Sequence, residues 1–517
     1  MPDASATATT AAPPAKASAS GSTALLTASL MAATFMQALD TTIANVALPH
    51  MEGSLSATQD QITWILTSYI VAAAIMTPLT GWLAGRFGRK RVILISVAGF
   101  VASSALCGVA SSLGQMVVYR LLQGVSGAAL VPISQAVLLD AYPTHRHGQA
   151  MAMWGLGVTL APVVGPVLGG WLTDNYSWRW VFYINVPIGI LAFFGLLARL
   201  KDTARTANRG FDFFGFAMLS LGVGALQMML DRGEIKDWFG SGEVVIEGLL
   251  AAAGFYFFIV RMITAEHPFL SLALFKDRNF VTGNVFIFVV GIILFATLVL
   301  LPPLFQGLMN YPVVTTGMIM APRGVGTMLS MILVGRMSGK IDPRILIAFG
   351  FGLSALSLWQ MMNFDLQMDM WPVIWSGLTQ GFGVGFAYVS LTSVSFATLP
   401  PQYRAEGTAF FNLMRNLGSS IGISAVQALL TENTQTMHQS LATQISPYNH
   451  WLHNFDLHST HTLAQLNEMV TSQAAMVAYN DDFKIMMVLS LLTIPFLLFM
   501  RVRKPQPGER QEMAVME

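Results

Sequence analysis

Cysteine and charge are both scarce in this chain of 517 residues. Its single cysteine, Cys107, excludes an intrachain disulfide framework. Charged residues make up 11% of the chain, whereas an average soluble domain has about 25%. A soluble protein of this length is also expected to divide into domains joined by polar linkers, and the sequence between residues 24 and 430 contains no such linker. The composition therefore excludes an ordinary soluble protein.

Motifs for nucleotide, metal and covalent chemistry are missing from the sequence as well. It has no GxxxxGK[ST] phosphate-binding loop, so ATP is not the expected energy source. It offers no Ser/His/Asp arrangement and no metal cluster, so we expect no enzyme, no catalytic residue, no cofactor and no metal site. The net charge of +1 gives no reason to expect a nucleic-acid partner.

Long apolar runs are abundant instead. The chain is 54% hydrophobic with a mean hydropathy of +0.57. About fourteen windows have the length of roughly 20 residues that crosses ~30 Å of hydrocarbon. These windows are 24–48, 61–84, 92–111, 113–139, 148–172, 180–199, 212–230, 244–263, 280–301, 313–336, 343–363, 371–397, 406–430 and 483–500. The sequence predicts an all-α polytopic protein of the lipid bilayer.

Lysine and arginine are distributed unequally between the loops. Loops after even-numbered helices carry most of them, from Arg86, Arg89, Lys90 and Arg91 to Arg404, and the C-terminal end adds Arg501, Arg503, Lys504 and Arg510. The loops on the other face carry Arg179, Arg232 and Lys236. Because cytoplasmic loops hold the excess of Lys and Arg, we predict that both termini are cytoplasmic.

A faint internal repeat suggests two related halves. GWLAGRFGRKR at 81–91 is echoed by GRMSGKIDPR at 335–344, as expected for two six-helix bundles with two helices inserted between them. The predicted divisions are a disordered cytoplasmic tail, an N-terminal bundle, the inserted pair, a C-terminal bundle with a long periplasmic loop at 431–480, and a second cytoplasmic tail: 1–23, 24–200, 201–279, 280–503 and 504–517.

Two charges inside the apolar windows are candidates for proton coupling. Asp40 lies in LDTTIANVALP (39–49) and Arg120 in YRLLQGVSGAA (119–129). A charge at the bilayer centre costs about 2.5–3.5 kcal/mol even on the insertion scale, so such residues are functional candidates. The alternatives are a structural Asp40 that bonds Asn45 or Thr41, and an Arg120 that snorkels to the membrane boundary.

Two glycine-rich segments are candidates for conformational change. The first is the turn between the second and third windows, where the candidates are Gly81, Arg86, Gly88 and Arg89; its alternative role is a positive-inside anchor. The second is GLGVTLAPVVGPVLGG (155–170), a kinked and closely packed helix that suits a hinge between the halves. Its candidates are Gly157, Pro162, Gly165, Pro166, Gly169 and Gly170.

Four polar residues are predicted to line a substrate cavity: Gln37, Asn45, Gln123 and Arg323. For Arg323, the attraction of anionic substrates competes evenly with a structural role of bonding carbonyls freed at Pro322. The chain has 31 methionines and 33 phenylalanines, and a flexible, polarizable surface of this kind favours hydrophobic amphiphiles as substrates.

Segment 431–480 is polar, and its runs LATQ and TLAQLNEMVTSQAAMVAYN are predicted to be helical. It contains five histidines, but no Cys or nearby acid completes a metal-ligand set. The histidines are His438, His450, His453, His458 and His461. Docking of a partner and a solvated loop without one both remain open for this segment.

Together these motifs resemble the major facilitator superfamily and, within it, the fourteen-helix drug:proton antiporter branch of EmrB-type multidrug exporters. The resemblance runs from Ala24 to about Lys504 and includes WRWVFYINVPIG (178–189), DRG and DWF (231–239), and PFLSLALFKDRNF (268–280). It implies that Asp40 is the acid of the first-helix signature, that Arg120 is the fourth-helix arginine linked to proton coupling, and that the glycines of 157–170 with Pro166 form the antiporter signature. One departure is Gly85, which stands where the family loop usually has Asp.

The function expected from these observations is proton-driven export of hydrophobic or amphiphilic drugs by alternating access. The resemblance implies a bacterial inner-membrane protein that works with a periplasmic membrane-fusion adaptor and an outer-membrane channel. The alternatives are a dedicated exporter of one metabolite, such as a fatty acid or a siderophore-like product, and a non-transporting sensor with a transporter fold.

Overall fold

The computed structural model describes residues 19–143, 146–202, 210–445 and 459–500. Within these ranges the chain is helical almost throughout and contains no β-strand apart from an isolated bridge between Ser338 and Ile341. The predicted tail 504–517 lies outside the described residues, as does most of 1–23. The first helix begins at Ala19, a few residues before the predicted start.

The first half of the chain forms one bundle. Its central contacts are made by α1 with α8 and α10, by α3 with α6, and by α5 with α6 and α10. The helices are α1 (Ala19–Leu55), α2 (Gln59–Ile62), α3 (Trp64–Met76), α4 (Leu79–Phe87), α5 (Arg89–Val109), α6 (Leu113–Gly127), α7 (Leu130–Ala141), α8 (His147–Asn175), α9 (Trp180–Tyr183) and α10 (Asn185–Arg199).

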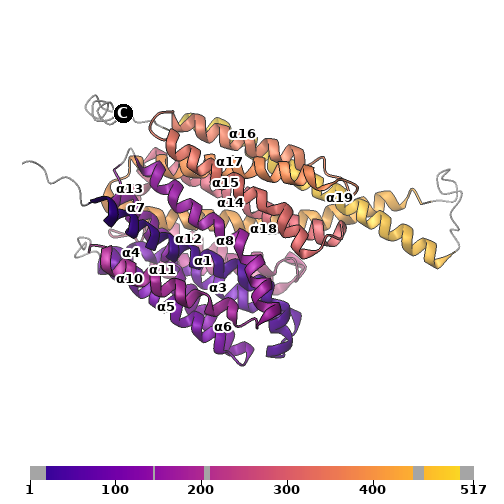
Figure 1. Ribbon diagram of the computed structural model, residues 1–517, viewed down its shortest axis with the longest axis horizontal. Coiled ribbons are helices and arrows are strands. Elements are labelled where there is room, and N and C mark those ends of the chain that lie inside the picture. The colour runs from indigo at the N-terminus through magenta and orange to yellow at the C-terminus, as the bar shows by residue number, and fades with distance from the viewer. Residues whose placement is uncertain (1–18, 144–145, 203–209, 446–458, 501–517) are drawn as a thin grey trace, which may run out of the picture.

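The second half forms the other bundle, in which α15 and α16 pack on α17, and α18 packs on α14 and α19. Figure 1 shows it above the first bundle, in orange and yellow. Its elements are α13 (Leu272–Lys276), α14 (Arg278–Pro303), η3 (Leu304–Leu308), α15 (Val313–Met337), α16 (Pro343–Met361), α17 (Met370–Ala397), η4 (Pro401–Tyr403), α18 (Arg404–Ala442), α19 (Thr460–Thr493) and η6 (Ile494–Phe499).

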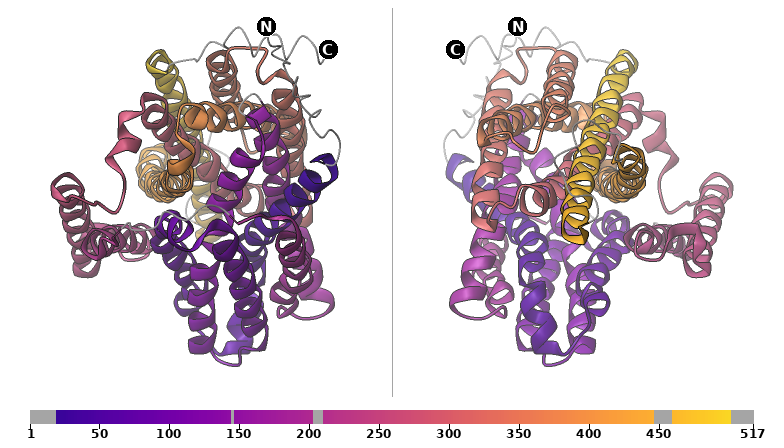
Figure 2. Two further views of the ribbon diagram at one scale, coloured as in Figure 1. Left: turned by 90° about the vertical axis from the view of Figure 1, so that its left-hand side faces the viewer. Right: turned by 90° about the vertical axis from the view of Figure 1, so that its right-hand side faces the viewer.

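Two further helices, α11 (Phe213–Arg232) and α12 (Gly242–Thr264), are joined by η2 (Trp238–Gly240) and pack on each other. They lie at one side of the two bundles, as both views in Figure 2 show. Helix α11 contacts α3 of the first bundle and α18 of the second. The predicted arrangement of two six-helix bundles with an inserted pair is therefore confirmed.

Several helices begin at a polar residue that caps free backbone N–H groups. The side chain of Ser112 accepts from Gln115 N at the start of α6, and that of Asp212 accepts from Gly215 N at the start of α11. Asp277 does the same for α14. These caps lie between the apolar runs, so the polar residues between the runs define where these three helices start.

By length and composition, nine helices of the described part could cross a membrane, or eleven when two bent pairs are counted as spans. The bent pairs are α3 with α4 and the two parts of α8. The three remaining predicted windows lie on α1, α17 and α18, which are long helices with more polar residues. Every predicted window thus lies on a helix.

The two bundles meet at one end, which carries Arg89 and Arg404 and which we call the Arg89 end. There α4 and α7 of the first bundle contact α18, and α8 contacts α15 and α17. At the opposite end, α18 and α19 extend beyond the other helices (Figure 1). Most of the segment predicted as a loop at 431–480 therefore belongs to these two helices.

Candidate functional site

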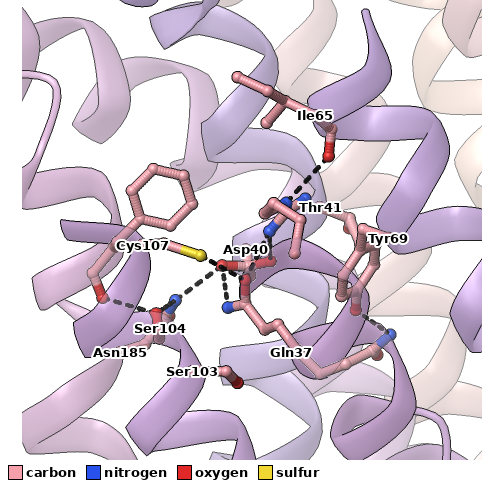
Figure 3. Close-up of polar contacts among 12 residues, drawn as sticks. Gln37, Asp40, Thr41, Ile65, Tyr69, Ser103, Ser104, Cys107 and Asn185 are labelled. Carbon is pink, nitrogen blue, oxygen red and sulfur yellow. Dashed lines mark hydrogen bonds and ion pairs between the residues drawn. The ribbon is translucent and has the colours of Figure 1, made fainter. Parts of the chain in front are cut away.

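Asp40 lies in the middle of α1 with no exposed surface. Its carboxylate accepts three hydrogen bonds from two other helices. Arg120 Nη1 of α6 lies 2.6 Å from Oδ2, while Gln123 Nε2 and Asn185 Nδ2 lie 2.8 and 2.9 Å from Oδ1. Figure 3 shows Asp40 at the centre of these contacts. Both carboxylate oxygens are thus satisfied although water does not reach them.

Arg120 is also wholly buried and has partners besides Asp40. Its Nε donates to the carbonyl of Ile65 at 3.1 Å, and its Nη1 donates to Gln123 Oε1 at 2.8 Å. The guanidinium carbon lies 4.4 Å from the ring centroid of Tyr69 and 5.7 Å from that of Phe182. The cation is therefore held by a carbonyl, an amide and two aromatic faces as well as by the carboxylate.

A second layer of polar groups orients the residues around the ion pair. Asn185 Nδ2 also lies 3.0 Å from Ser104 Oγ, and Ser104 donates to the carbonyl of Phe182 at 2.8 Å. The thiol of Cys107 lies 3.7 Å from Gln123 Oε1. These contacts, visible in Figure 3, join α5, α6, α9 and α10 around α1. A change at Asp40 therefore alters contacts made by most helices of the first bundle.

The Asp40–Arg120 pair is neutral as a whole but contains two charges away from water. Bringing two ions into a low dielectric costs several kcal/mol for each ion, and their attraction repays this only when further hydrogen bonds complete the site. Here Gln123, Asn185 and the Ile65 carbonyl supply those bonds. Anything that neutralises one partner leaves the other as an uncompensated buried charge.

Helix α8 packs closely on the turn of α1 that follows Asp40. A methyl group added to Gly165 would collide with Thr42, and one added to Gly169 would lie 2.7 Å from a side-chain atom of Ile43. Gly157 faces the same helix nearer its start. Thr42 Oγ1 also lies 3.5 Å from the Ala161 carbonyl. The predicted hinge glycines therefore adjoin the helix that carries Asp40.

The same helix is bent. Its two parts, which end at Pro162 and begin at Val167, meet at an angle of 41°. Proline removes a backbone donor and is the usual cause of a kink. Pro166 lies in this break, and Gly170 follows it as a half-buried residue of α8.

The glycine-rich turn lies at the Arg89 end. Gly81 of α4 lies so near α18 that an added Cβ would be 2.7 Å from the Glu406 Cα. Gly88 joins α4 to α5 with a φ of 86°, a conformation that glycine adopts without strain. Arg86 is exposed. The two glycines thus permit a turn and a close approach between the bundles.

Arg89 takes part in a charged contact between the two bundles. It forms an ion pair with Asp140 of α7 and donates to the carbonyl of Pro401 at 3.5 Å. Arg404 of α18 binds the same carboxylate, with Nη1 2.8 Å from Asp140 Oδ1, and donates to the Leu139 carbonyl at 3.0 Å. Asp140 therefore accepts from an arginine of each bundle.

The four predicted cavity residues do not form one group. Gln37 donates to the Tyr69 hydroxyl at 3.1 Å, so it touches the outer part of the Asp40 network. Gln123 is wholly buried between Asp40 and Arg120. Asn45 is exposed on α1. Arg323 lies on α15, in the second bundle.

Arg323 is bonded to a neighbouring helix. Its Nη2 lies 2.9 Å from the Leu294 carbonyl and 2.8 Å from Thr297 Oγ1, both on α14. The carbonyl that it binds thus belongs to α14 and not to the turn before Pro322. Its Nη1 is buried without a partner in the described part of the protein.

A polar cluster between the bundles was not predicted. Gln135 Nε2 of α7 lies 3.1 Å from the Tyr388 hydroxyl of α17, and Asn412 Nδ2 of α18 lies 2.6 Å from Gln135 Oε1. Arg415 Nη1 lies 3.4 Å from the same hydroxyl, and Trp154 of α8 stacks on the Tyr388 ring. This inter-bundle cluster joins two helices of each half.

Asn185, Tyr69 and Ser104 were also missed as members of the Asp40 network. All three are uncharged polar residues within apolar runs. The one available signal was Asn185, an amide inside the motif WRWVFYINVPIG. Amides in such runs often bond across helices, but the sequence does not say to which partner.

Among the described residues, no group of three or more His, Cys, Asp or Glu side chains could hold a metal ion. His438 Nε2 lies 3.1 Å from Asn467 Oδ1, which links α18 to α19, and His461 lies in the first turn of α19. His450, His453 and His458 lie outside the described residues.

Comparison with known proteins places these features in a family. The sequence model of the Major Facilitator Superfamily matches residues 30–423. The chain is 37% identical to the multidrug export protein EmrB of Escherichia coli K12, over 89% of this chain and 91% of that protein. It is also 37% identical to the fatty acid resistance protein FarB of Neisseria gonorrhoeae, over 91% of this chain and 95% of that protein.

Solved structures agree with this fold. A double-tryptophan mutant of XylE superposes with a TM-score of 0.62 at 13% identity, covering 95% of this chain and 98% of that one. The human organic anion transporter MFSD10 superposes with a TM-score of 0.60 at 14% identity, covering 92% and 99%. At these identities the likeness concerns the fold alone.

Proposed function

This chain belongs to the Major Facilitator Superfamily, and we propose that it is a proton-driven antiporter that exports hydrophobic or amphiphilic compounds by alternating access. The single observation that carries the proposal is the buried pair of Asp40 and Arg120. The proton gradient is its energy source, and it needs no cofactor.

The proposed proton coupling follows from the opposite charges of Asp40 and Arg120. A proton that reaches Asp40 removes the negative charge and weakens the contact with Arg120. Arg120 then keeps the Ile65 carbonyl, Gln123 and the ring of Tyr69 as partners. One charge that crosses a potential of 100 mV supplies ~2.3 kcal/mol, enough to bias a conformational cycle by more than tenfold.

The change is passed to the rest of the protein along α1. Gly165 and Gly169 of α8 lie against Thr42 and Ile43 of α1. A shift of the turn of α1 that carries Asp40 therefore displaces α8, the bent helix. Helix α8 in turn contacts α15 and α17 of the second bundle. This route connects the proton site to the surface on which the two halves rock.

The distribution of Lys and Arg supports an orientation with the Arg89 end and both termini in the cytoplasm of a bacterial inner membrane. In that orientation, the present conformation is closed to the cytoplasm by the Arg89–Asp140–Arg404 contact and by the inter-bundle cluster. Loading of a substrate from the cytoplasm or the inner leaflet requires these contacts to separate.

The names of two relatives support the proposed substrates. One is named for multidrug export and the other for fatty acid resistance, and fatty acids are lipophilic. The second name also favours the alternative of an exporter dedicated to one fatty acid or similar metabolite. Arg323, with a buried and unpartnered Nη1 in the described part, is a candidate contact for the negative group of such a substrate.

A periplasmic adaptor and an outer-membrane channel are the proposed protein partners. Helix α18 has 39 residues, which at 1.5 Å per residue gives a length of about 58 Å, against ~30 Å of hydrocarbon. Its excess length, together with the first part of α19, supports a helical projection into the periplasm to which an adaptor can bind.

The test is proton release by the purified protein when compounds are added from a panel of unrelated lipophiles. Proton-driven polyspecific export predicts release with many of them. Release with a single fatty acid would favour the dedicated exporter, whereas silence with every compound would contradict antiport and favour the sensor.

A further inference from the structure

A second acid, Asp482, is buried where α19 enters the second bundle. It has no exposed surface. It shares the inner face of the helix with Tyr479, Phe483 and Met486, in the spacing of one helical stripe. This face packs on the segment that follows α16, since the rings of Phe483 and Phe364 lie 6.2 Å apart. The carboxyl group is therefore enclosed by apolar side chains.

The carboxyl group of Asp482 has no partner there. Within the residues that the structure describes, both of its oxygens are buried and neither accepts a hydrogen bond. The titratable groups that interact with it are Asp481 and Tyr479, both on α19. Asp481 carries the same sign of charge and so opposes ionisation. Asp40 is equally buried, but Arg120, Gln123 and Asn185 all donate to it.

An ionised carboxylate without a cation, a donor or water is strongly disfavoured in an apolar interior, and such a group binds a proton instead. We propose that Asp482 is a second proton-binding site, which is occupied in this conformation and releases its proton when α19 shifts against α16. The inference rests on the proposed proton-driven antiport. It assigns one coupling acid to each bundle, with Asp482 neutral in the present conformation.

A path for the proton lies on the adjacent face of α19. A surface pocket of about 370 Å³ is lined by Asn433 of α18 and by Asp481, Lys484, Ile485 and Val488 of α19. The pocket thus borders Asp481, the residue next to Asp482. Lys484, two positions further on and exposed, lies on this outer face of α19 and not beside the Asp482 carboxyl group.

The direct test is infrared spectroscopy of the purified full-length protein at neutral pH, comparing wild type with Asp482→Asn. A protonated carboxyl group has a carbonyl band that a carboxylate lacks. We expect this band in wild type and its loss in Asp482→Asn, while the control Glu468→Gln, an exposed acid on the same helix, keeps it. Identical spectra of wild type and Asp482→Asn would overturn the proposal.

The functional test is the proton-to-substrate ratio in proteoliposomes with an imposed pH gradient. Asp482→Asn is expected to move one fewer proton per substrate than wild type, and Glu468→Gln the same number. If Asp482→Asn does not fold, Asp482→Glu is expected to keep the ratio and to shift the carbonyl band. A wild type that moves no proton contradicts the proposed function itself. A proton-driven wild type whose ratio is unchanged in Asp482→Asn contradicts only the second site.

Discussion

Arg120 Nη1 lies 2.6 Å from Asp40 Oδ2, and the two side chains are both shielded from water. They come from α6 and α1, which are 80 residues apart in sequence at these positions. This pair is the polar centre of an otherwise apolar bundle. Gln123, Asn185 and the Ile65 carbonyl complete the site with further hydrogen bonds, so a change of charge on either partner disturbs the whole network.

Replacing Asp40 with asparagine is expected to abolish export driven by a pH gradient, because the side chain keeps its shape but no longer binds a proton. The variant also leaves Arg120 as an uncompensated buried charge, which destabilises the protein by about 3–5 kcal/mol. Transport into acid-loaded vesicles and thermal unfolding measure the two effects. Asp174→Asn, an exposed position on α8, is the control and is expected to change neither. Full pH-driven export by Asp40→Asn would contradict the coupling role.

Removing both charges is expected to separate the effect on stability from the effect on proton-driven export. In a variant with Asp40→Asn and Arg120→Gln, no uncompensated charge remains, and the two changes should be non-additive by about 0.5–3 kcal/mol, as for residues in direct contact. Thermal unfolding of both single variants and the double variant gives this coupling energy. Export should stay absent in the double variant although its stability recovers. A stability loss equal to the sum of the single variants would show that the pair does not interact.

The sequence predicts those residues of this site that are unusual in a membrane helix. A charge in an apolar run is costly, so Asp40 and Arg120 are visible without a structure. Asn185, Tyr69 and Gln135 are not, since uncharged polar residues are common in such helices and their role depends on which helix lies opposite. The number of apolar windows likewise predicts the helices, but not that Asn412 of α18 reaches Gln135 of α7.

The lengths of the helices could also be predicted only in part from the sequence. Hydropathy detects the portion of a helix that lies in hydrocarbon, so it placed the end of the window on α18 at residue 430, whereas the helix continues to Ala442. The family departure at Gly85 raised the question of what replaces the missing aspartate at the Arg89 end. The structure has Asp140 bound by Arg89 of one bundle and Arg404 of the other, a pairing that a single sequence does not specify.

That contact leads to a prediction about conformation. Arg404→Gln removes the arginine that the second bundle contributes to Asp140. The carboxylate is partly exposed, so the expected loss is about 0.2–1 kcal/mol, a shift of up to about fivefold toward the state that is open at the Arg89 end. The shift can be measured as the distance between spin labels on Phe87 and Ile345, both exposed at this end, with Cys107 replaced by serine. Lys276→Gln, on α13, serves as the control. An unchanged distance distribution would exclude this contact as a gate.

The seam between α1 and α8 can be tested by adding one methyl group. Gly165→Ala places a Cβ against Thr42, and overpacking of this kind costs about 1–3 kcal/mol. We expect a lower melting temperature and slower export, because α8 can no longer approach the Asp40 turn. The matched control is Gly352→Ala on α16, where an added Cβ meets nothing within 4 Å and where alanine is favoured over glycine in a helix. Equal effects of the two substitutions would show that close packing of the seam is not required.

The inter-bundle cluster can be tested with two Tyr→Phe substitutions. One removes a hydroxyl that bonds between the bundles, and the other removes a hydroxyl that bonds within the first bundle. Tyr388→Phe removes a hydroxyl that accepts from Gln135 across the bundles, whereas Tyr142→Phe removes one that bonds Thr27 within the first bundle. The bond to Gln135 and the bond to Thr27 are each worth about 0.5–1.5 kcal/mol, and Tyr388→Phe also loses the contact of Arg415 with the same hydroxyl.

Only Tyr388→Phe is expected to change the balance between conformations, because its lost bond exists only when the Arg89 end is closed. Spin labels on Phe87 and Ile345 should report a larger open fraction for Tyr388→Phe and the wild-type distribution for Tyr142→Phe. Tyr388→Phe should lose at least as much thermal stability as Tyr142→Phe, since its hydroxyl has two partners. If they open the protein equally, the effect belongs to general destabilisation, and the cluster does not hold the two halves together.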